Sequence, residues 1–346
     1  MTVTTARPGS TAVGTIRARR LALVAALLGL LVLAVLASLA IGAKPIPLAG
    51  VWDALWSPTG TEDDVVVRAL RVPRTILGVG VGVALGVAGA LMQGHTRNPL
   101  ADPGLLGVSA GAAFLVVVGI YALHVDSLYG YVWFAFAGAL GASVLVFLLG
   151  SLGRGGPTPV TLALAGVAVS ALLGALTSAL VLTDTRTLDT FRFWSVGALA
   201  GRDTEIAGQV APFLVVGLLL AFANAPALNL LSLGEDVARG LGQNVAVARW
   251  TGLAAITLLT GAAVAACGPI GFVGLVVPHV VRYFTGPDHR WLLPASGLAG
   301  AVLLLAADVV GRVVVRPGEL EVGIVLAFVG APFFVALVRR RKLVQL

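Results

Sequence analysis

The side chains that most often carry out chemistry in proteins are scarce and scattered in this sequence. The one cysteine, Cys267, cannot form an internal disulfide, and the four histidines are too widely spaced for a metal-binding motif. Lysine occurs only at Lys44 and Lys342, and neither follows the glycine-rich turn of a phosphate-binding P-loop. We therefore expect no metal, no cofactor and no ATP hydrolysis on this chain, so any energy must come from a partner or an ion gradient.

Arginine is the exception, because four arginines gather near the ends of two predicted helices. Arg68, Arg71 and Arg74 follow one another at three-residue spacing, which places them roughly on one helical face. Arg312 adds a fourth charge at the end of a later apolar run. The pattern predicts that they project from the helix ends and receive an acidic protein or an anionic ligand.

A second candidate is the loop from Leu231 to Asn244. Its Gly234-Glu235-Asp236 opening puts two acids where a helix N-terminus favours negative charge. The alternation of small and apolar residues then predicts a short helix, a turn and another helix. A loop this apolar indicates a partner surface, and an amphipathic helix lying in a membrane interface is the alternative.

Polar residues within the apolar runs are few. Asp308 lies one turn before Arg312, and we favour a structural i,i+4 pair that neutralises both charges. Gln93 and Asn98 are uncharged and are candidates to line or close a pore. The apolar runs contain no Asp, Glu or His relay of the kind that a proton- or sodium-driven carrier uses.

Composition indicates which solvent surrounds the elements that hold these residues. The chain has 346 residues, of which 58% are hydrophobic and 11% are charged, and its mean hydropathy is +0.99. Soluble domains carry about 25% charged residues. The sequence therefore predicts an all-α, polytopic transmembrane bundle of about ten spans and excludes a soluble enzyme. The net charge of +7 follows from topology, because no basic face typical of nucleic-acid binding is visible.

The predicted order is a cytoplasmic tail at 1–20 and a single transmembrane domain at 21–346. The first apolar run is longer than the core of a cleaved signal peptide, so we expect an uncleaved helix. The ten predicted spans are Leu21–Ile41, Pro73–Gln93, Leu105–Leu123, Tyr131–Leu149, Val160–Leu182, Ile206–Ala225, Ala246–Ala266, Phe272–Phe284, Trp291–Gly311 and Val322–Val338.

Arginine and lysine favour cytoplasmic locations for both termini, since more of them then lie inside than outside. This topology places the loop 231–244 inside and the four arginines outside. Arginine side chains that extend to lipid headgroups require no protein partner. Four arginines on the side with fewer positive charges are more than this explanation accounts for.

Two breaks in the apolar runs indicate a pathway instead of a simple anchor. They are 98–104 (NPLADPG) and 267–271 (CGPIG), and broken backbone at membrane depth is tolerated where it is buried in protein or lines an aqueous cavity. Five spans separate them, so matching segments run in opposite directions. This spacing is typical of an inverted repeat.

Short motifs along the chain resemble the FecCD-type permeases of bacterial ABC importers for iron siderophores and cobalamin. The resemblance runs in order from about residue 20 to the C-terminus. The matching segments are 71–75 (RVPRT), 88–93 (AGALMQ), 97–107 (RNPLADPGLLG), 164–168 (LAGVA), 233–236 (LGED), 268–275 (GPIGFVGL), 278–279 (PH), 288–290 (DHR) and 330–332 (GAP).

The resemblance implies a permease of ten helices with an internal inverted repeat, in the bacterial cytoplasmic membrane. It implies a second permease subunit, identical or paralogous, two cytoplasmic ATPase subunits that carry ATP and Mg, and an extracytoplasmic substrate-binding protein. Arg71, Arg74 and Arg312 occupy the positions that receive acidic residues of the binding protein, and Arg68 lies beside them. The positions that match the ATPase-coupling loop are Gly234, Glu235, Asp236, Ala238, Arg239, Gly240, Leu241 and Gly242.

Asn98 resembles a cytoplasmic gate residue of the family, with Gln93 nearby. A polar pair that helps to close the gate in a cobalamin relative is replaced here by Pro159 and Val160, and Thr158 or Thr161 is the candidate substitute. The segments 100–108, 191–194 and 316–320 look most similar to ferric-enterobactin-type permeases, which implies a ferric siderophore. Cobalamin and heme permeases of the family, and a gradient-driven secondary transporter, are the alternatives.

Overall fold

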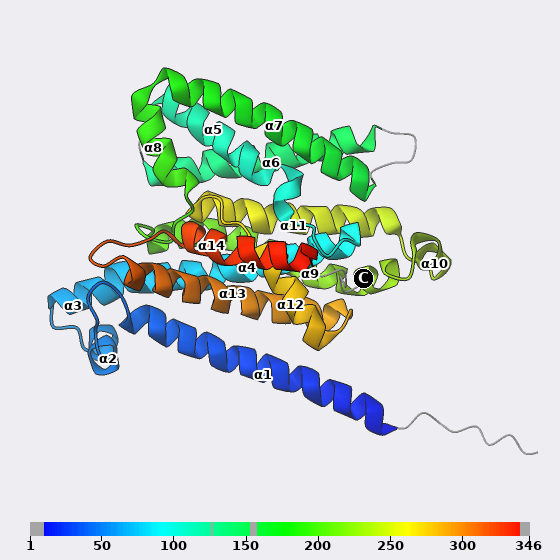
Figure 1. The fold of residues 1–346 in the computed structure, drawn as a ribbon, viewed down its shortest axis with the longest axis horizontal. Helices are drawn as coiled ribbons and strands as arrows, with labels where there is room; N and C mark the ends of the chain where they lie inside the picture. The colour runs from blue at the N-terminus through cyan, green and yellow to red at the C-terminus, as the bar shows by residue number, and fades with distance from the viewer. Residues whose placement is uncertain (1–9, 126, 153–157, 340–346) are drawn as a thin grey trace, which may run out of the picture.

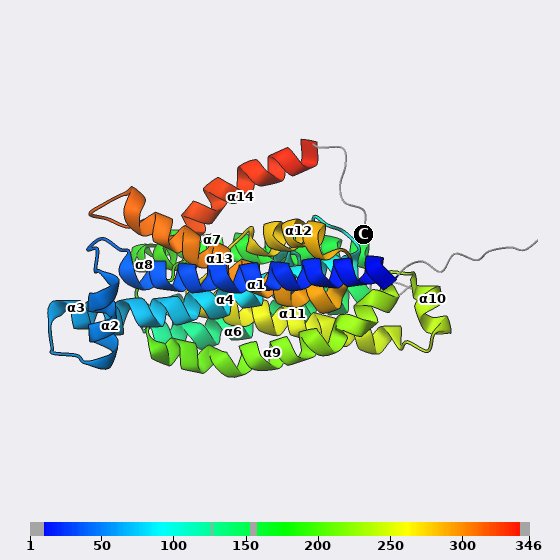
Figure 2. The same ribbon diagram turned by 90° about the horizontal axis from the view of Figure 1, so that it is seen from below.

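A computed structural model of the chain describes residues 10–125, 127–152 and 158–339. Within these residues the chain is helical and has no strands. The longer helices run roughly parallel to one axis (Figure 1), and α14 leans away from the others (Figure 2). The helices are α1 (Ser10–Ala40), α2 (Leu48–Trp56), α3 (Glu62–Val65), η1 (Val66–Arg71), α4 (Val72–Thr96), η2 (Pro103–Leu106), α5 (Val108–Leu123), α6 (Leu128–Ser151), α7 (Pro159–Thr183), α8 (Thr185–Ser195), α9 (Thr204–Leu231), α10 (Glu235–Gly240), α11 (Val245–Cys267), α12 (Val273–Thr285), α13 (His289–Val314) and α14 (Val322–Arg339).

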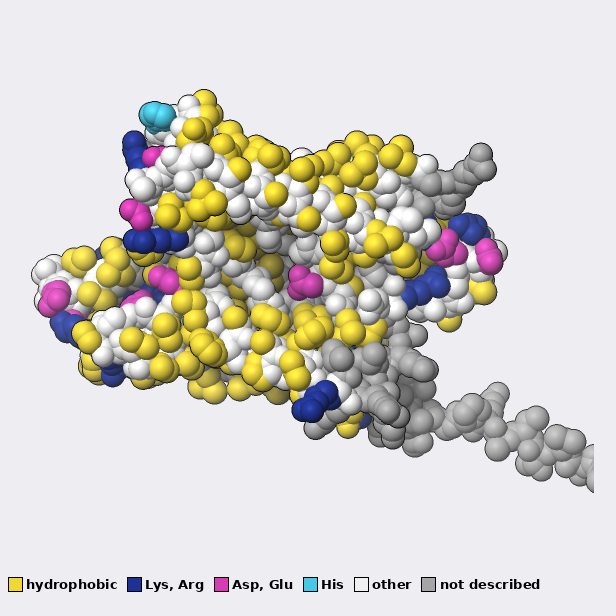
Figure 3. Space-filling view, turned by 45° about the horizontal axis from the view of Figure 1, so that its top comes forward, with side chains coloured by type: hydrophobic (Ala, Val, Ile, Leu, Met, Phe, Trp, Pro, Cys, Tyr) yellow, Lys and Arg dark blue, Asp and Glu magenta, His cyan; other side chains and the backbone are white. Residues whose placement is uncertain are grey.

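Seven of these helices are long and apolar enough to cross a membrane, and three shorter apolar helices accompany them. Together they make the ten spans that the sequence predicts. Most charged side chains gather at the two ends of the molecule, and hydrophobic side chains cover most of the middle, where one acidic group is visible (Figure 3). We call the end that carries α2, α3 and η1 the outer end, and the end that carries α10 the inner end.

Helix α4 is the centre of the bundle, and its glycines allow α13 to approach closely. A Cβ on Gly82 would lie 2.5 Å from the Cα of Ala301, and one on Gly86 would lie 2.1 Å from the carbonyl oxygen of Ser296. Both contacts are with the α13 backbone. Because glycine has no side chain, the backbones of α4 and α13 come into close contact. Such close packing holds membrane helices together where no hydrophobic effect acts between them.

Several element boundaries differ from the sequence prediction. The first helix begins at Ser10, so the predicted tail at 1–20 is helical from that residue, while residues 1–9 lie outside the described part. The second span begins at Glu62, where Thr61 and Asp64 form a capping box, and passes through a π-helical turn before Pro73. A proline ring clashes with the carbonyl four residues back, and the wider π turn relieves that clash.

The two predicted breaks precede the two shortest spans. Helix α5 follows the irregular segment after α4, and α12 follows the segment 268–272 after α11. Each is the third span of its half of the chain, and they run in opposite directions (Figure 1). This arrangement agrees with an inverted repeat.

Candidate functional site

A buried ion cluster at the outer end joins α4 to α13. Asp308 is fully buried and accepts hydrogen bonds from Arg74 Nε at 2.9 Å and from Arg74 Nη2 at 2.7 Å. It also accepts one from Arg312, which confirms the predicted i,i+4 pair. Arg74 Nη1 reaches Glu319 at 2.6 Å. Two guanidinium groups and two carboxylates thus balance in charge, with Asp308 fully buried and Glu319 partly exposed.

The same cluster ties down the end of α1. Arg71 Nη1 donates to the carbonyls of Leu39 at 2.6 Å and Ala40 at 2.9 Å, and Arg312 Nη1 donates to Ser38 O at 2.7 Å. The last carbonyls of a helix lack partners within the helix and carry partial negative charge. Two arginines from other helices therefore cap α1, and fix it against α4 and α13.

The expectation that all four arginines project from the helix ends is wrong for three of them. Arg71, Arg74 and Arg312 are 5%, 8% and 2% exposed, because each has internal carboxylate or carbonyl partners. Arg68 is exposed. The three buried arginines instead line a cavity of about 490 Å³ at the outer end.

Positive charge predominates along the wall of this outer cavity. Lys44 and Arg202 join the three arginines there, and Asp203 and Glu319 are its acids. Burial lowers the pKa of the Arg202 guanidinium, and a hydrogen bond from the Tyr129 hydroxyl lowers the pKa of the Asp203 carboxyl. With five basic groups against two acids in its wall, the cavity can attract an anionic group. Glu319 and Arg202 were not predicted from the sequence as cavity residues. Their neighbours on the cavity wall include residues more than a hundred positions away, and no spacing in the sequence links them.

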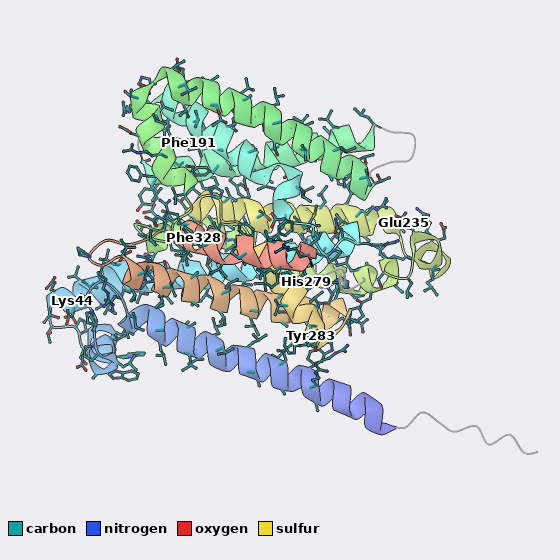
Figure 4. The ribbon with its side chains drawn as sticks, in the orientation of Figure 1. Lys44, Phe191, Glu235, His279, Tyr283 and Phe328 are labelled. Atoms are coloured by element: carbon teal, nitrogen blue, oxygen red, sulfur yellow. The ribbon has the colours of Figure 1, made fainter. Side chains whose placement is uncertain are left out.

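The loop 231–244 forms a short helix, α10, at the opposite end of the molecule. Figure 4 shows Glu235 there, far from Lys44 at the outer end. Glu235 pairs with Arg239 at 3.0 Å and also with Arg249 of α11, which anchors the start of α10. One short helix is present as predicted, but the second short helix predicted within this loop is absent, because the chain turns at Leu241–Gly242 and enters the membrane-spanning helix α11 at Val245.

The two sides of α10 differ in burial. Ala238 is fully buried in a small cluster with residues of α9 and α11. Val237 and Leu241 are 49% and 60% exposed, and the flanking Gly234 and Gly242 have φ of 112° and 84°, which favour glycine. The inner end therefore presents an apolar knob, Val237 and Leu241, on a short helix held by ion pairs. Gly240 and Asp236 complete its exposed rim.

The three candidate gate residues lie in different surroundings. Gln93 is fully buried, donates to Leu275 O at 3.2 Å and accepts from Arg282 at 3.3 Å, so it joins α4 to α12 instead of lining an open passage. Asn98 is exposed and its side chain accepts from Leu100 N at 3.0 Å. Thr161 forms a capping box with Thr158 at the start of α7.

Comparison with known proteins identifies the family of this chain, which the geometry alone does not. The model of the FecCD transport family matches residues 30–340, almost the whole chain. The chain belongs to the FecCD transport family. It is 48% identical over 329 residues to the ferric enterobactin transport system permease protein FepD of Escherichia coli, covering 95% of this chain and 98% of that protein.

Other FecCD relatives differ in what their names say they carry. The hemin transport system permease protein HmuU of Yersinia pestis is 41% identical, with 91% of this chain and 95% of that protein covered. The cobalamin import system permease protein BtuC of Halobacterium salinarum is 44% identical over 80% of this chain and 74% of that protein. A solved metal-chelate type ABC transporter in an inward-facing conformation is 31% identical, with a TM-score of 0.80 over 93% of this chain and 99% of that one.

The family and the geometry agree that this FecCD chain is a multi-pass membrane permease. In the described residues no group of three or more His, Cys, Asp or Glu side chains is placed to hold a metal ion. The described chain has a basic cavity at its outer end and the apolar knob of Val237 and Leu241 at its inner end, and packed helices connect the two.

Proposed function

We propose that this chain is the transmembrane permease subunit of an ATP-driven importer that moves a ferric siderophore, of the catecholate class, across the bacterial cytoplasmic membrane. The observation that carries the proposal is the 48% identity to the ferric enterobactin permease along 98% of that protein's length. Hemin and cobalamin chelates are the competing substrates, since permeases of those names match with lower identity or coverage.

The inner end is the proposed contact with two cytoplasmic ATPase subunits that carry ATP and Mg. The exposed Val237 and Leu241 side chains fit an apolar groove, and the ion pairs of Glu235 with Arg239 and Arg249 support a rigid connection to α9 and α11. A displacement of α10 by the ATPase would therefore move α9 and α11, and both of these spans pack directly on α4. Movement of such packed helices is how an importer alternates access. The described chain begins with α1 and finishes with α14, and the first residue of α1 and the last of α14 are directed toward this inner end (Figure 1); we assign both termini to the cytoplasm.

The outer cavity is the proposed receptor for an extracytoplasmic substrate-binding protein. Its net positive wall of Lys44, Arg71, Arg74, Arg202 and Arg312 favours an acidic side chain of that protein. Arg68, exposed at the rim, would supply long-range attraction to the same partner. A second permease subunit, identical or paralogous, would complete the pathway.

The experiment is uptake of ⁵⁵Fe-labelled ferric enterobactin and hemin, and of ⁵⁷Co-labelled cobalamin, into cells that lack their own permeases for these chelates and express this chain with its partner subunits. Ferric enterobactin uptake that depends on the chain and on the ATPase supports the proposal. Uptake of hemin or cobalamin instead would replace the substrate, and uptake that persists without the ATPase would overturn the ATP-driven mechanism.

The role of each end is tested separately by co-purification. Replacing Gly234–Gln243 with a Gly/Ser linker is expected to release the ATPase and to leave the binding protein attached. Arg68→Glu combined with Arg71→Gln is expected to do the reverse. Retention of the ATPase by the first variant, or of the binding protein by the second, would contradict the corresponding assignment.

A further inference from the structure

The two breaks of the inverted repeat meet inside the bundle. Pro103, in the first break, packs against Gly274 at the start of α12, where a Cβ would lie 2.8 Å from the proline ring. Gly89 of α4 contacts Gly274 from the other side. Between the breaks lies a cavity of about 120 Å³, which is large enough for an ion with a few waters. Its lining consists of Leu85, Asp102, Pro103, Gly104, Ser109, Thr260, Val264, Pro269, Ile270, Gly271 and Gly274.

Asp102 brings a negative charge to this cavity. Its Oδ1 accepts a hydrogen bond from Gly104 N at 2.8 Å, as a cap of η2. No arginine, lysine or histidine of the described residues lies within salt-bridge distance of it. This contrasts with Asp308, which has two guanidinium partners. The Asp102 side chain is partly buried, and a carboxylate that is partly withdrawn from water without a cation is destabilised.

Thr260 brings a hydroxyl group without a partner. The hydroxyls of other helical threonines donate to the carbonyl four residues back, as in Thr96, Thr177 and Thr251. The Thr260 side chain is 3% exposed, and its hydroxyl has no hydrogen-bond partner within the described chain. Because a buried polar group without a partner destabilises a fold, this oxygen points to a ligand that shares the cavity.

The chemistry of the lining selects the kind of ligand. The polar groups are a carboxylate, the hydroxyls of Ser109 and Thr260, and the backbone of the break at 269–271, so oxygen is the available donor atom. Histidine and cysteine, which transition metals prefer, are absent from the lining. Calcium sites gather several carboxylates, whereas one carboxylate neutralises a single positive charge.

We propose that this cavity binds one alkali-metal cation, with Na⁺ as the occupant, between the two breaks. Its ligands are the Asp102 carboxylate, the hydroxyls of Ser109 and Thr260, and carbonyl oxygens of the segment 269–271. Carbonyls of unwound helix segments are known Na⁺ ligands at repeat interfaces of membrane transporters. The ion ties a break of one half of the chain to a break of the other, and so holds α5 and α12 in register. It is a structural ion and is not coupled to uphill transport.

The test is the effect of Na⁺ on the thermal stability of the purified full chain in detergent, with choline as the reference at constant ionic strength. A ligand that binds the folded state alone stabilises it by RT ln(1 + [L]/Kd), so the melting temperature rises with the logarithm of the ligand concentration once that exceeds Kd. Na⁺ is expected to stabilise the wild type. Asp102→Asn, which keeps an oxygen to cap Gly104, is expected to lose the effect. Thr260→Val is expected to raise the Na⁺ concentration at half-effect by about tenfold.

Thr257→Val is the matched control, because this buried threonine lies one turn earlier on α11 and lines a different, apolar cavity. It should keep the wild-type response to Na⁺. Binding of ²²Na⁺ to the wild type and to Asp102→Asn gives a second readout, which does not depend on melting. Equal melting temperatures in Na⁺ and choline, or an Asp102→Asn protein that still binds ²²Na⁺, would overturn the proposal.

Discussion

Asp308→Asn is the most informative single change, because one buried carboxylate holds two arginines from different helices. The asparagine keeps the size of the side chain and one acceptor oxygen, but it removes the charge that faces Arg74 and Arg312. Arg312 is 2% exposed and has no other carboxylate within salt-bridge distance in the described chain. Arg74 keeps its contact with Glu319.

The expected loss follows from the number of charges left without a partner. Removing one partner of a buried ion pair costs about 3–5 kcal/mol, since a charge remains in a water-excluded site. Only Arg312 is left without a carboxylate partner, and it keeps its hydrogen bonds to the end of α1, so we expect about 3 kcal/mol, at the lower end of that range. Combining Asp308→Asn with Arg312→Gln removes the stranded charge and should recover about 2 kcal/mol of the loss.

The assay is reversible unfolding in mixed detergent micelles with increasing SDS, followed by the fluorescence of the six tryptophans. Asp236→Asn, whose side chain is fully exposed on α10, is the control and should unfold like the wild type. A loss below about 1 kcal/mol for Asp308→Asn, or a double variant as unstable as the sum of its parts, would refute the role of the cluster.

Three further predictions follow from other contacts. Gly86→Ala should destabilise the bundle by about 1–3 kcal/mol, because its Cβ would meet the Ser296 carbonyl oxygen at 2.1 Å; Gly141→Ala, which meets nothing within 4 Å, is the control in the same unfolding assay. A hydrogen bond from the Tyr129 hydroxyl and, against the effect of burial, hydrogen bonds from the Ile206 and Glu205 amides lower the pKa of the Asp203 carboxyl below 3.8. Its contribution to stability is therefore complete above pH 3.8 and lost as pH falls through the lower folded value, so hydrogen-exchange protection of the amides at 205–206, corrected for intrinsic rates, should fall only in strong acid; an unchanged profile there would contradict this. Val237→Asp should reduce ATPase co-purification about tenfold at unchanged melting temperature, and equal recovery would remove the apolar knob from the interface.

The sequence predicted the number of spans and their order, because a bilayer requires about 20 apolar residues for each crossing. It predicted the Asp308–Arg312 pair for a similar reason, since i,i+4 neighbours contact each other whenever a helix forms. The sequence also shows Gly78, Gly82 and Gly86 at four-residue spacing, a pattern of small residues that is typical of a contact between membrane helices. These features depend on residues close together in the chain.

The positions of helix ends were less accurate. The start of the second span moved from Pro73 to Glu62 because a capping box and a π-helical turn extend the helix on its N-terminal side. Hydropathy reports where the bilayer begins, whereas hydrogen bonding decides where the helix begins. The short helices α2 and α8 at the outer end were missed for the same reason.

What each polar residue contacts was decided by tertiary structure. Arg74 and Asp308 are 234 positions apart, and only the packing of α4 on α13 turns a predicted docking arginine into part of a buried ion cluster. In the sequence, Asp102 is only one residue of a proline-rich break. The tertiary structure places it beside the second break and near the unpartnered hydroxyl of Thr260. The sequence by itself determined that the chain spans a membrane and resembles a transport family, because hydropathy and short motifs depend on residues that are close together in the chain. The burial and partner of a charge depend on residues distant in the chain, and only the folded bundle brings those together.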